Sequence, residues 1–199
     1  MNEDFLESLQ KNLTPLDEER KTRLIDYYKI LLRFNKVVHL TSKTETDLAI
    51  MRNIYDAAVL HVFLPEIEEL VDLGAGAGFA GVVMKILRPD LRVFLVERNV
   101  KKSSFLSLAI KELKMEEAIV LTKDWADLKL SADVGVSKAS CGLENLVVLM
   151  PNFLKEDGIL VHYSTSQKKC LRPDNFYQYY SPYAKKPQYL CVFRNRESQ

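Results

Sequence analysis

The sequence predicts an α/β fold in which helices precede a mostly parallel sheet. Apolar residues recur at helical spacing before Pro65, and short β-branched runs alternate with helix-length stretches after it. This alternation is typical of parallel strands joined by crossover helices that cover both faces of a sheet. We therefore expect one domain over residues 1–199, with a helical extension at 1–64 and the sheet that carries the site at 65–199.

Length and composition indicate an ordinary globular protein. Of the 199 residues, 47% are hydrophobic and 28% charged, which excludes disordered and low-complexity classes. The longest apolar run, residues 146–150, is far shorter than the ~20 residues that cross a bilayer, and the acidic N-terminus is unlike a signal peptide. Three widely spaced cysteines favour a reducing compartment over a disulfide framework or a zinc site. We expect a cytoplasmic protein with no membrane contact and no metal.

Three helices are expected in the first third of the chain. The first covers residues 5–13. The second starts with Thr14 as N-cap and Pro15 as first helical residue, and continues to about Phe34. The third starts at Thr44, and its expected buried stripe is Leu48, Met51, Tyr55, Ala58 and Val62. We interpret the three stripes as core.

Seven short runs after Pro65 are expected to be strands. Five of them alternate with helical stretches: residues 70–73, 93–96, 119–121, 134–137 and 159–162. The last two, 175–179 and 188–194, have no helix-length connection between them, so they can pair as antiparallel strands. The prediction is a mixed seven-stranded sheet with an antiparallel C-terminal edge.

The sharpest local signal follows the first strand, where glycines alternate with small residues. Gly74, Gly76 and Gly78 let the backbone approach a ligand closely, and the helix that begins there offers unpaired N–H groups. A dinucleotide fingerprint requires a third glycine at the sixth position, where this chain has Phe79. The loop is therefore expected to bind a ligand other than a dinucleotide pyrophosphate.

Two acidic residues flank this loop. Glu97 ends the second expected strand, where a carboxylate can accept both hydroxyls of a ribose, as NAD and S-adenosylmethionine each require. Asp72 can hold the ammonium of a methionine moiety by charge-assisted hydrogen bonds. Together with the glycines, these acids favour an S-adenosylmethionine site, and a nicotinamide-dependent oxidoreductase is the less favoured alternative.

Six segments in a fixed order then resemble a known family. They are residues 35–41 (NKVVHLT), 52–56 (RNIYD), 72–81, 95–106, 133–143 and 190–194. This pattern is similar to that of the 16S ribosomal RNA guanine-N7 methyltransferases, the glucose-inhibited division protein B family. The resemblance covers nearly the whole chain, and its strength lies in the order and spacing of motifs that are individually weak.

The resemblance implies the Rossmann-like fold of class I methyltransferases and an enzyme that methylates a guanine in the 530 loop of 16S ribosomal RNA. Its cofactor contacts, carried over by position, would be Gly74, Phe79, Trp125, Ala126 and Lys138. Guanine N7 has a free lone pair and no proton to lose, so methyl transfer needs in-line placement and a suitable field and needs no general base.

Several residues depart from the family pattern at polar positions. His39 stands where the family has Asn, Asn53 where it has His, and Lys138 where it has Arg. Lys138 keeps the charge but loses the planar fork of Arg. We name Lys138 and His39 as the candidate catalytic residues. These departures leave open an S-adenosylmethionine-binding relative with another substrate or with lost activity.

An RNA substrate would be met by a local basic patch, since the chain carries a net charge of only +1. The candidate RNA-binding residues are Arg33, Lys36, Arg52, Lys101 and Lys102, with Lys43, Lys168, Lys169 and Arg172 as further candidates. The expected partner is 16S ribosomal RNA or the 30S subunit. No heptad pattern predicts an oligomer, so a monomer is expected.

Overall fold

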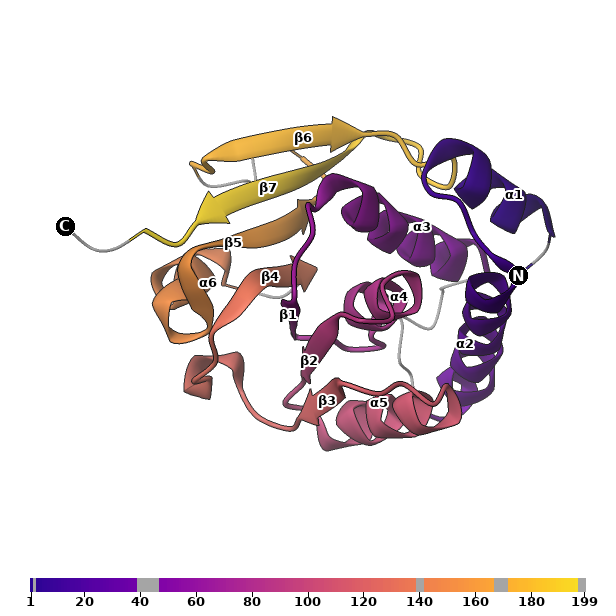
Figure 1. The fold of residues 1–199 in the computed structure, drawn as a ribbon, viewed down its shortest axis with the longest axis horizontal. Coiled ribbons are helices and arrows are strands. Elements are labelled where there is room, and N and C mark those ends of the chain that lie inside the picture. The colour runs from indigo at the N-terminus through magenta and orange to yellow at the C-terminus, as the bar shows by residue number, and fades with distance from the viewer. Residues whose placement is uncertain (2, 39–46, 139–141, 167–171, 197–199) are drawn as a thin grey trace.

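The computed structural model describes residues 1, 3–38, 47–138, 142–166 and 172–196, and its centre is a seven-stranded sheet (Figure 1). The sheet has the order β3-β2-β1-β4-β5-β7-β6. Strands β1 to β5 are parallel, and β7 runs antiparallel to both β5 and β6. The expected mixed sheet with an antiparallel C-terminal edge is confirmed. The strands are β1 (Glu69–Leu73), β2 (Arg92–Val96), β3 (Ala118–Leu121), β4 (Ala132–Lys138), β5 (Leu154–Ser164), β6 (Asn175–Tyr179) and β7 (Gln188–Arg194).

The helices cover the two faces of the sheet unequally (Figure 1). One face is covered by α3 (Asp47–Phe63), α4 (Phe79–Leu87) and α5 (Val100–Glu112). Outside this layer, α1 (Glu3–Asn12) packs against α3, and α2 (Glu18–Val38) packs against α4 and α5. Among the described residues, the opposite face is covered by the short α6 (Leu143–Val148) and two 3-10 turns, η1 (Trp125–Asp127) and η2 (Met150–Asn152). The N-terminal helices thus belong to the same core as the sheet.

The second helix begins later than the sequence predicts. Thr14 and Pro15 precede α2, which begins at Glu18. The Asp17 carboxylate accepts the backbone N–H of Arg20 at 2.7 Å, so Asp17 caps this helix in place of Thr14. The expected start of the third helix, Thr44, lies outside the described residues.

The buried face of α3 differs in part from the prediction. Tyr55 and Ala58 are buried as expected, but Leu48 and Val62 are 53% and 54% exposed. The helix instead buries a second apolar stripe, which comprises Ile50, Ile54, Ala57 and Leu60. Because α3 is apolar around most of its circumference, periodicity alone could not decide which stripe faces the core.

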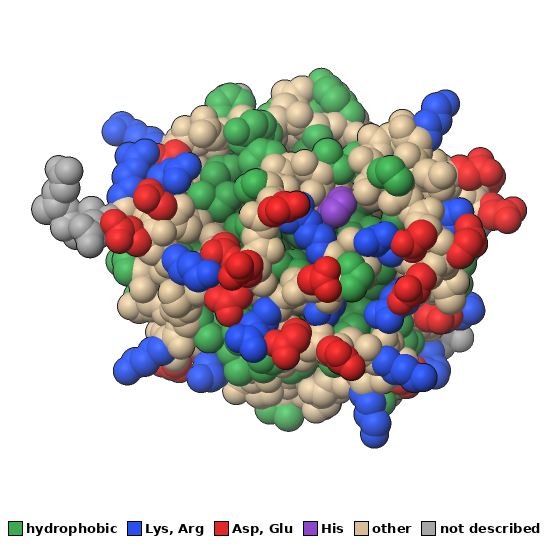
Figure 2. Space-filling view, viewed as in Figure 1, with side chains coloured by type: hydrophobic (Ala, Val, Ile, Leu, Met, Phe, Trp, Pro, Cys, Tyr) green, Lys and Arg blue, Asp and Glu red, His purple; other side chains and the backbone are tan. Residues whose placement is uncertain are grey.

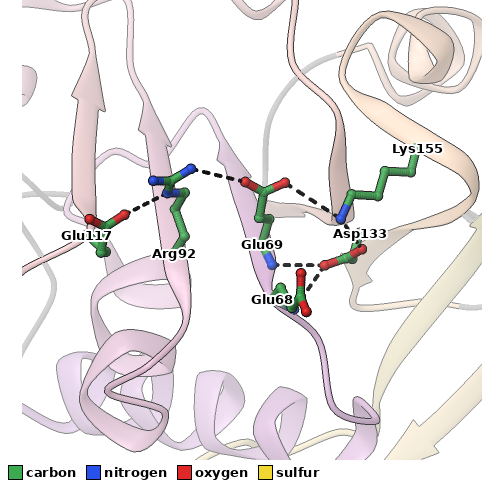
Figure 3. A network of polar contacts seen from close by, with 6 residues as sticks. All are labelled: Glu68, Glu69, Arg92, Glu117, Asp133 and Lys155. Atoms are coloured by element: carbon green, nitrogen blue, oxygen red, sulfur yellow. Dashed lines mark hydrogen bonds and ion pairs between the residues drawn. The ribbon is translucent and has the colours of Figure 1, made fainter.

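Charged side chains connect the amino ends of four strands (Figure 3). Arg92 of β2 pairs with Glu117 at 2.6 Å and with Glu69 of β1 at 3.5 Å. Lys155 of β5 pairs with Asp133 of β4 at 2.8 Å and lies 3.7 Å from Glu69. Burial would raise the pKa of Asp133, but Lys155 and two backbone N–H groups hold that pKa below its usual value. Ion pairs therefore hold together the amino ends of these strands, at the edge opposite the carboxyl ends of the parallel strands.

Three expectations about composition can be compared with the described part of the chain. Within it, no helix combines the length and apolarity that a membrane span requires. Nor do His, Cys, Asp and Glu residues gather there as a set that could hold a metal ion. The sequence favours a reducing compartment over a disulfide framework, whereas Cys191, wholly buried in β7, is disulfide-bonded.

Candidate functional site

The glycine loop lies where β1 ends and α4 begins. Its backbone folds back over the next strand, because the N–H groups of Gly74 and Ala75 both donate to the carbonyl of Val96 at 2.9 Å. Gly78, the N-cap of α4, has a φ of 82°, and a Cβ there would lie 2.7 Å from the Leu106 side chain. Only glycine meets both conditions at this position. The predicted strand, loop and helix are all confirmed.

Glu97 lies against the glycine loop, as its place at the end of β2 predicts. Its carboxylate accepts the Gly76 N–H at 2.9 Å with Oε2 and the Asn99 N–H at 2.8 Å with Oε1. The side chain is buried, which is uncommon for a glutamate and requires such partners. Glu97 therefore connects the loop after β1 to the loop after β2. Its contact with a ribose stays a prediction.

Asp72 lies beneath the loop and is wholly enclosed. Its Oδ2 accepts the Gly81 N–H in the first turn of α4 at 2.8 Å. Burial raises its pKa to about 7, while the Gly81 bond acts in the opposite direction. A carboxyl group with this pKa binds a cation with a strength that depends on pH near neutrality. The proposed contact of Asp72 with an ammonium group remains a prediction.

Tyr27 of α2 braces the same loop, a role that the sequence did not reveal. Its hydroxyl donates to the Ala77 carbonyl at 2.7 Å, and its ring lies 6.5 Å from that of Phe79. Tyr27 is fully buried, and burial raises the pKa of its phenol well above the usual value. Helical spacing marks Tyr27 only as core, because the sequence does not show which buried position faces the loop.

Lys138 is held at the carboxyl end of β4 by two residues of α3. Its ammonium donates to Asn53 Oδ1 at 2.6 Å and to Asp56 Oδ2 at 2.7 Å, and it lies 5.1 Å from the centre of the Tyr163 ring. The Tyr163 hydroxyl donates to the Asp56 carbonyl at 3.0 Å. Two departures from the family pattern, Asn53 and Lys138, are thus in direct contact.

Tyr179 at the end of β6 joins this cluster. Burial, followed by the Asp56 carboxylate beside it, raises the pKa of its phenol. For Tyr163 the order of causes is the same, burial and then Asp56. We name this group of Asn53, Asp56, Lys138, Tyr163 and Tyr179 the lysine cluster. The sequence marked Lys138 and Asn53, but it gave no signal for the two tyrosines, since a tyrosine at a strand end usually packs.

The remaining predicted cofactor residues lie after β3. Trp125 is half-buried and packs against the core under α6. The Ala126 N–H donates to the Asp124 carboxylate at 3.1 Å, and Asp124 also pairs with Arg98 at 3.2 Å. An adenine contact through Ala126 would therefore replace the bond to Asp124.

The predicted RNA-binding residues are dispersed. Lys101 and Lys102 lie in the first turn of α5, where their N–H groups donate to the Asn99 side chain, next to Glu97. Arg52 precedes Asn53 on α3 and is half-buried. Arg33 is bound at 2.5 and 2.6 Å to Glu112 in the last turn of α5, away from the glycine loop. His39, Lys43, Lys168, Lys169 and the side chain of Lys36 lie outside the described residues.

The other two histidines do not belong to the glycine loop. His61 accepts a hydrogen bond from Arg88 at 3.0 Å, and burial, followed by the charge of Arg88, lowers its pKa to about 4. His162 is 2.8 Å from the Ser137 hydroxyl, and burial lowers its pKa too. Both are neutral at physiological pH and connect elements of the fold.

The strand order and the glycine loop define a class I methyltransferase fold. Solved structures with the same fold include TYW2 of M. jannaschii in complex with AdoMet, with a TM-score of 0.55 and 18% identity over 72% of this chain and 74% of that one. An RNA methyltransferase from Salinibacter ruber in complex with S-adenosyl-L-homocysteine has a TM-score of 0.53 and 15% identity, over 66% of this chain and 83% of that one. At these identities the likeness establishes the fold alone.

Sequence relatives define the family within that class. The chain is 33% identical to ribosomal RNA small subunit methyltransferase G of Streptococcus pyogenes, over 80% of this chain and 71% of the relative. It is 35% identical to the protein of the same name from Dichelobacter nodosus, over 61% of each chain. A family model described as GidB, rRNA small subunit methyltransferase G, matches residues 20–180. The chain belongs to this family, and the predicted resemblance is confirmed.

Proposed function

We propose that this protein transfers a methyl group from S-adenosylmethionine to N7 of a guanine in the 530 loop of 16S ribosomal RNA. Membership of the rRNA methyltransferase family supports the substrate class. The observation that carries the cofactor assignment is the glycine loop, which Glu97 binds on one side and under which Asp72 lies on the other.

The cofactor would lie along the carboxyl edge of β1, β2 and β3. Its adenosyl part would lie between Glu97 and Trp125, and its methionine part above Asp72 and the glycine loop. Lys138 would bind the methionine carboxylate by a charge-assisted hydrogen bond. S-adenosylmethionine supplies an electrophilic methyl group on a sulfonium.

The side chains of this edge suit a transfer that releases no proton from the base. The lysine cluster offers a fixed cation, since Asn53 and Asp56 hold the Lys138 ammonium. Because Asp56 is paired with it, the cluster adds little net charge near a guanine that becomes cationic on methylation. The contact between Asn53 and Lys138 keeps a cation in place although both residues depart from the family pattern, which supports retained activity.

We further propose that the protein acts as a monomer in the cytoplasm on the assembled 30S subunit. Residues 1–64 and 65–199 act as one unit, since their apolar residues share one core. Lys101 and Lys102, next to Glu97, are the best-placed candidates for contact with RNA phosphates.

Two measurements test this function. Calorimetry should show that S-adenosylhomocysteine binds and that NADH does not, and the reverse would support an oxidoreductase. With tritiated S-adenosylmethionine, 30S subunits from a strain that lacks the modification should take up label and modified subunits should not. Cofactor binding with no label in the unmodified subunits would point to a different substrate.

A further inference from the structure

The C-terminal hairpin of β6 and β7 stands apart in charge from the rest of the chain. Residues 172–196 contain five Lys and Arg residues and one acid, a net charge of +4, while the whole chain carries +1. The remainder is therefore net negative. Two of these cations are paired within the fold, Arg194 with Asp157 at 3.6 Å and Arg196 with Asp174 at 2.6 Å. Arg172, Lys185 and Lys186 are exposed.

One face of β6 also exposes aromatic rings. Phe176 and Gln178 share this face, and Gln178 donates to the hydroxyl of Tyr180, one residue past the end of the strand, at 2.6 Å. Phe176 is 47% exposed and Tyr180 is 70% exposed. Figure 2 shows hydrophobic side chains along the upper rim of the molecule, where Figure 1 places β6 and β7. An exposed aromatic pair at the edge of a sheet requires an explanation.

Rings on the other face of the hairpin hold it to the helices. Tyr177 lies 4.3 Å from Phe63 of α3, measured between ring centres. In the loop after β6, Tyr183 lies 5.3 Å from Phe5 of α1 and 5.8 Å from Tyr55 of α3. Tyr177 is itself 45% exposed, so these ring contacts hold the hairpin to the helices while leaving Tyr177, Phe176 and Tyr180 accessible.

Contacts within the lysine cluster connect the hairpin to the proposed site. β6 ends at Tyr179, whose phenol lies beside Asp56, and Asp56 holds Lys138 at the end of β4. Four strand spacings separate β6 from β1, which leads into the glycine loop, or about 19 Å at roughly 4.8 Å each. A few nucleotides that flank a guanine at the glycine loop span this distance.

From these observations we infer that Phe176 and Tyr180, with Arg172, Lys185 and Lys186, form a binding surface for unpaired RNA nucleotides next to the methylated guanine. We name these five residues the β6 surface. Exposed aromatic side chains stack with bases, and the cations that precede and follow β6 neutralise phosphates. A second copy of the chain fits this surface less well, because two hairpins of net charge +4 would repel each other. The inference rests on the proposed function for the identity of the RNA.

Two double variants test the β6 surface. Phe176→Ala with Tyr180→Ala removes the rings, and Lys185→Gln with Lys186→Gln removes two charges. The matched control is Lys111→Gln with Lys114→Gln, two exposed lysines at the far end of α5. Of the substituted residues, Lys114 has a positive φ of 49°, and the others have none. A thermal melt of each variant verifies that it folds.

The first measurement is the affinity of each protein for a fluorescein-labelled single-stranded RNA of about 12 nucleotides, within the usual site size of such surfaces. We expect each surface variant to bind at least ten-fold more weakly than wild type, and the control to bind within two-fold of it. The lysine variant should also lower the slope of log affinity against log salt by about 1.4, roughly 0.7 for each lost cation. The affinity for S-adenosylhomocysteine should not change in any variant.

The second measurement is the KM for 30S subunits in the methylation assay, which should rise by a similar factor in both surface variants. Wild-type RNA affinity and KM in both would overturn the inference while leaving the proposed function intact. A wild-type protein that binds the RNA through the β6 surface but labels no ribosomal RNA would support the inference and refute the function. A dimer that Phe176→Ala with Tyr180→Ala dissociates, with unchanged RNA binding, would assign the surface to a second copy instead.

Discussion

The burial of Asp72 predicts that its ionised carboxylate lowers the stability of the fold and at the same time favours binding of the cofactor. Its pKa in the fold is about 7 against 3.8 in the unfolded chain, mainly because it is buried. A raised carboxyl pKa means that the folded state binds the proton more tightly, so this group costs stability as the pH rises from about 4 to about 7. The cost grows by about 1.4 kcal/mol per pH unit and reaches at most roughly 4 kcal/mol above pH 7.

The substitution Asp72→Asn removes this ionisation and keeps an oxygen that can accept the Gly81 N–H. We expect the variant to unfold at higher urea concentration than wild type at pH 8, and the difference in unfolding free energy to shrink by about 2 kcal/mol between pH 7 and pH 5.5. Urea titrations at several pH values give this difference directly, provided that the m-value is unchanged.

Cofactor binding should change in the opposite direction. If Asp72 holds the ammonium of the methionine part, Asp72→Asn weakens S-adenosylhomocysteine binding by at least ten-fold at pH 8. The affinity of the wild-type protein should also decrease when the pH is lowered below 7, because Asp72 then takes up a proton. Calorimetry at pH 6 and pH 8 measures both effects. A variant less stable than wild type at pH 8, or a stability difference independent of pH, would refute the reasoning about Asp72.

Three further predictions concern the support of the same edge. Tyr27→Phe removes the hydrogen bond to Ala77, so we expect a loss of about 1 kcal/mol in unfolding free energy and weaker S-adenosylhomocysteine binding; affinity equal to wild type would show that the brace does not shape the loop. Gly78→Ala adds a Cβ against Leu106 in a left-handed residue, which should cost roughly 2–4 kcal/mol in a denaturant titration; a cost under 1 kcal/mol would contradict the geometry. Lys138→Met leaves the buried Asp56 carboxylate without its ion pair and should cost about 3 kcal/mol. Adding Asp56→Asn should recover much of that loss, and full additivity of the two changes would refute the pairing.

The elements of the sheet could be predicted because two local signals agreed. Val134 to Ser137 and the other β-branched runs alternate with helical stretches, and the glycines after β1 fix the place of the loop. The connection between the last two runs is too short for a crossover helix, and this predicted the antiparallel edge. The start of α2 and the buried face of α3 were predicted less well. Asp17 and Thr14 are both suitable caps, and α3 has two apolar stripes, so only long-range packing decides between them.

The candidate site could be predicted only for residues whose place next to a strand is visible in the sequence. Asp72, Gly74 and Glu97 could be found because each lies at or just after the end of a strand, and the parallel order of β1 and β2 brings these ends to one edge. Tyr27, Asp56 and Tyr179 reach that edge from distant segments. Their residue types are equally typical of a core, so only the packing of α2, α3 and β6 shows what they contact.

The central claim is that this edge of the sheet directs a methyl group to guanine N7 in small-subunit ribosomal RNA. Mass spectrometric mapping of 16S RNA, after incubation of unmodified 30S subunits with the protein and S-adenosylmethionine, tests it most directly. We predict one new methylguanosine, at N7 and within the 530 loop. A methyl group on another base or another atom, or an RNA of unchanged mass with active cofactor binding, would contradict the account.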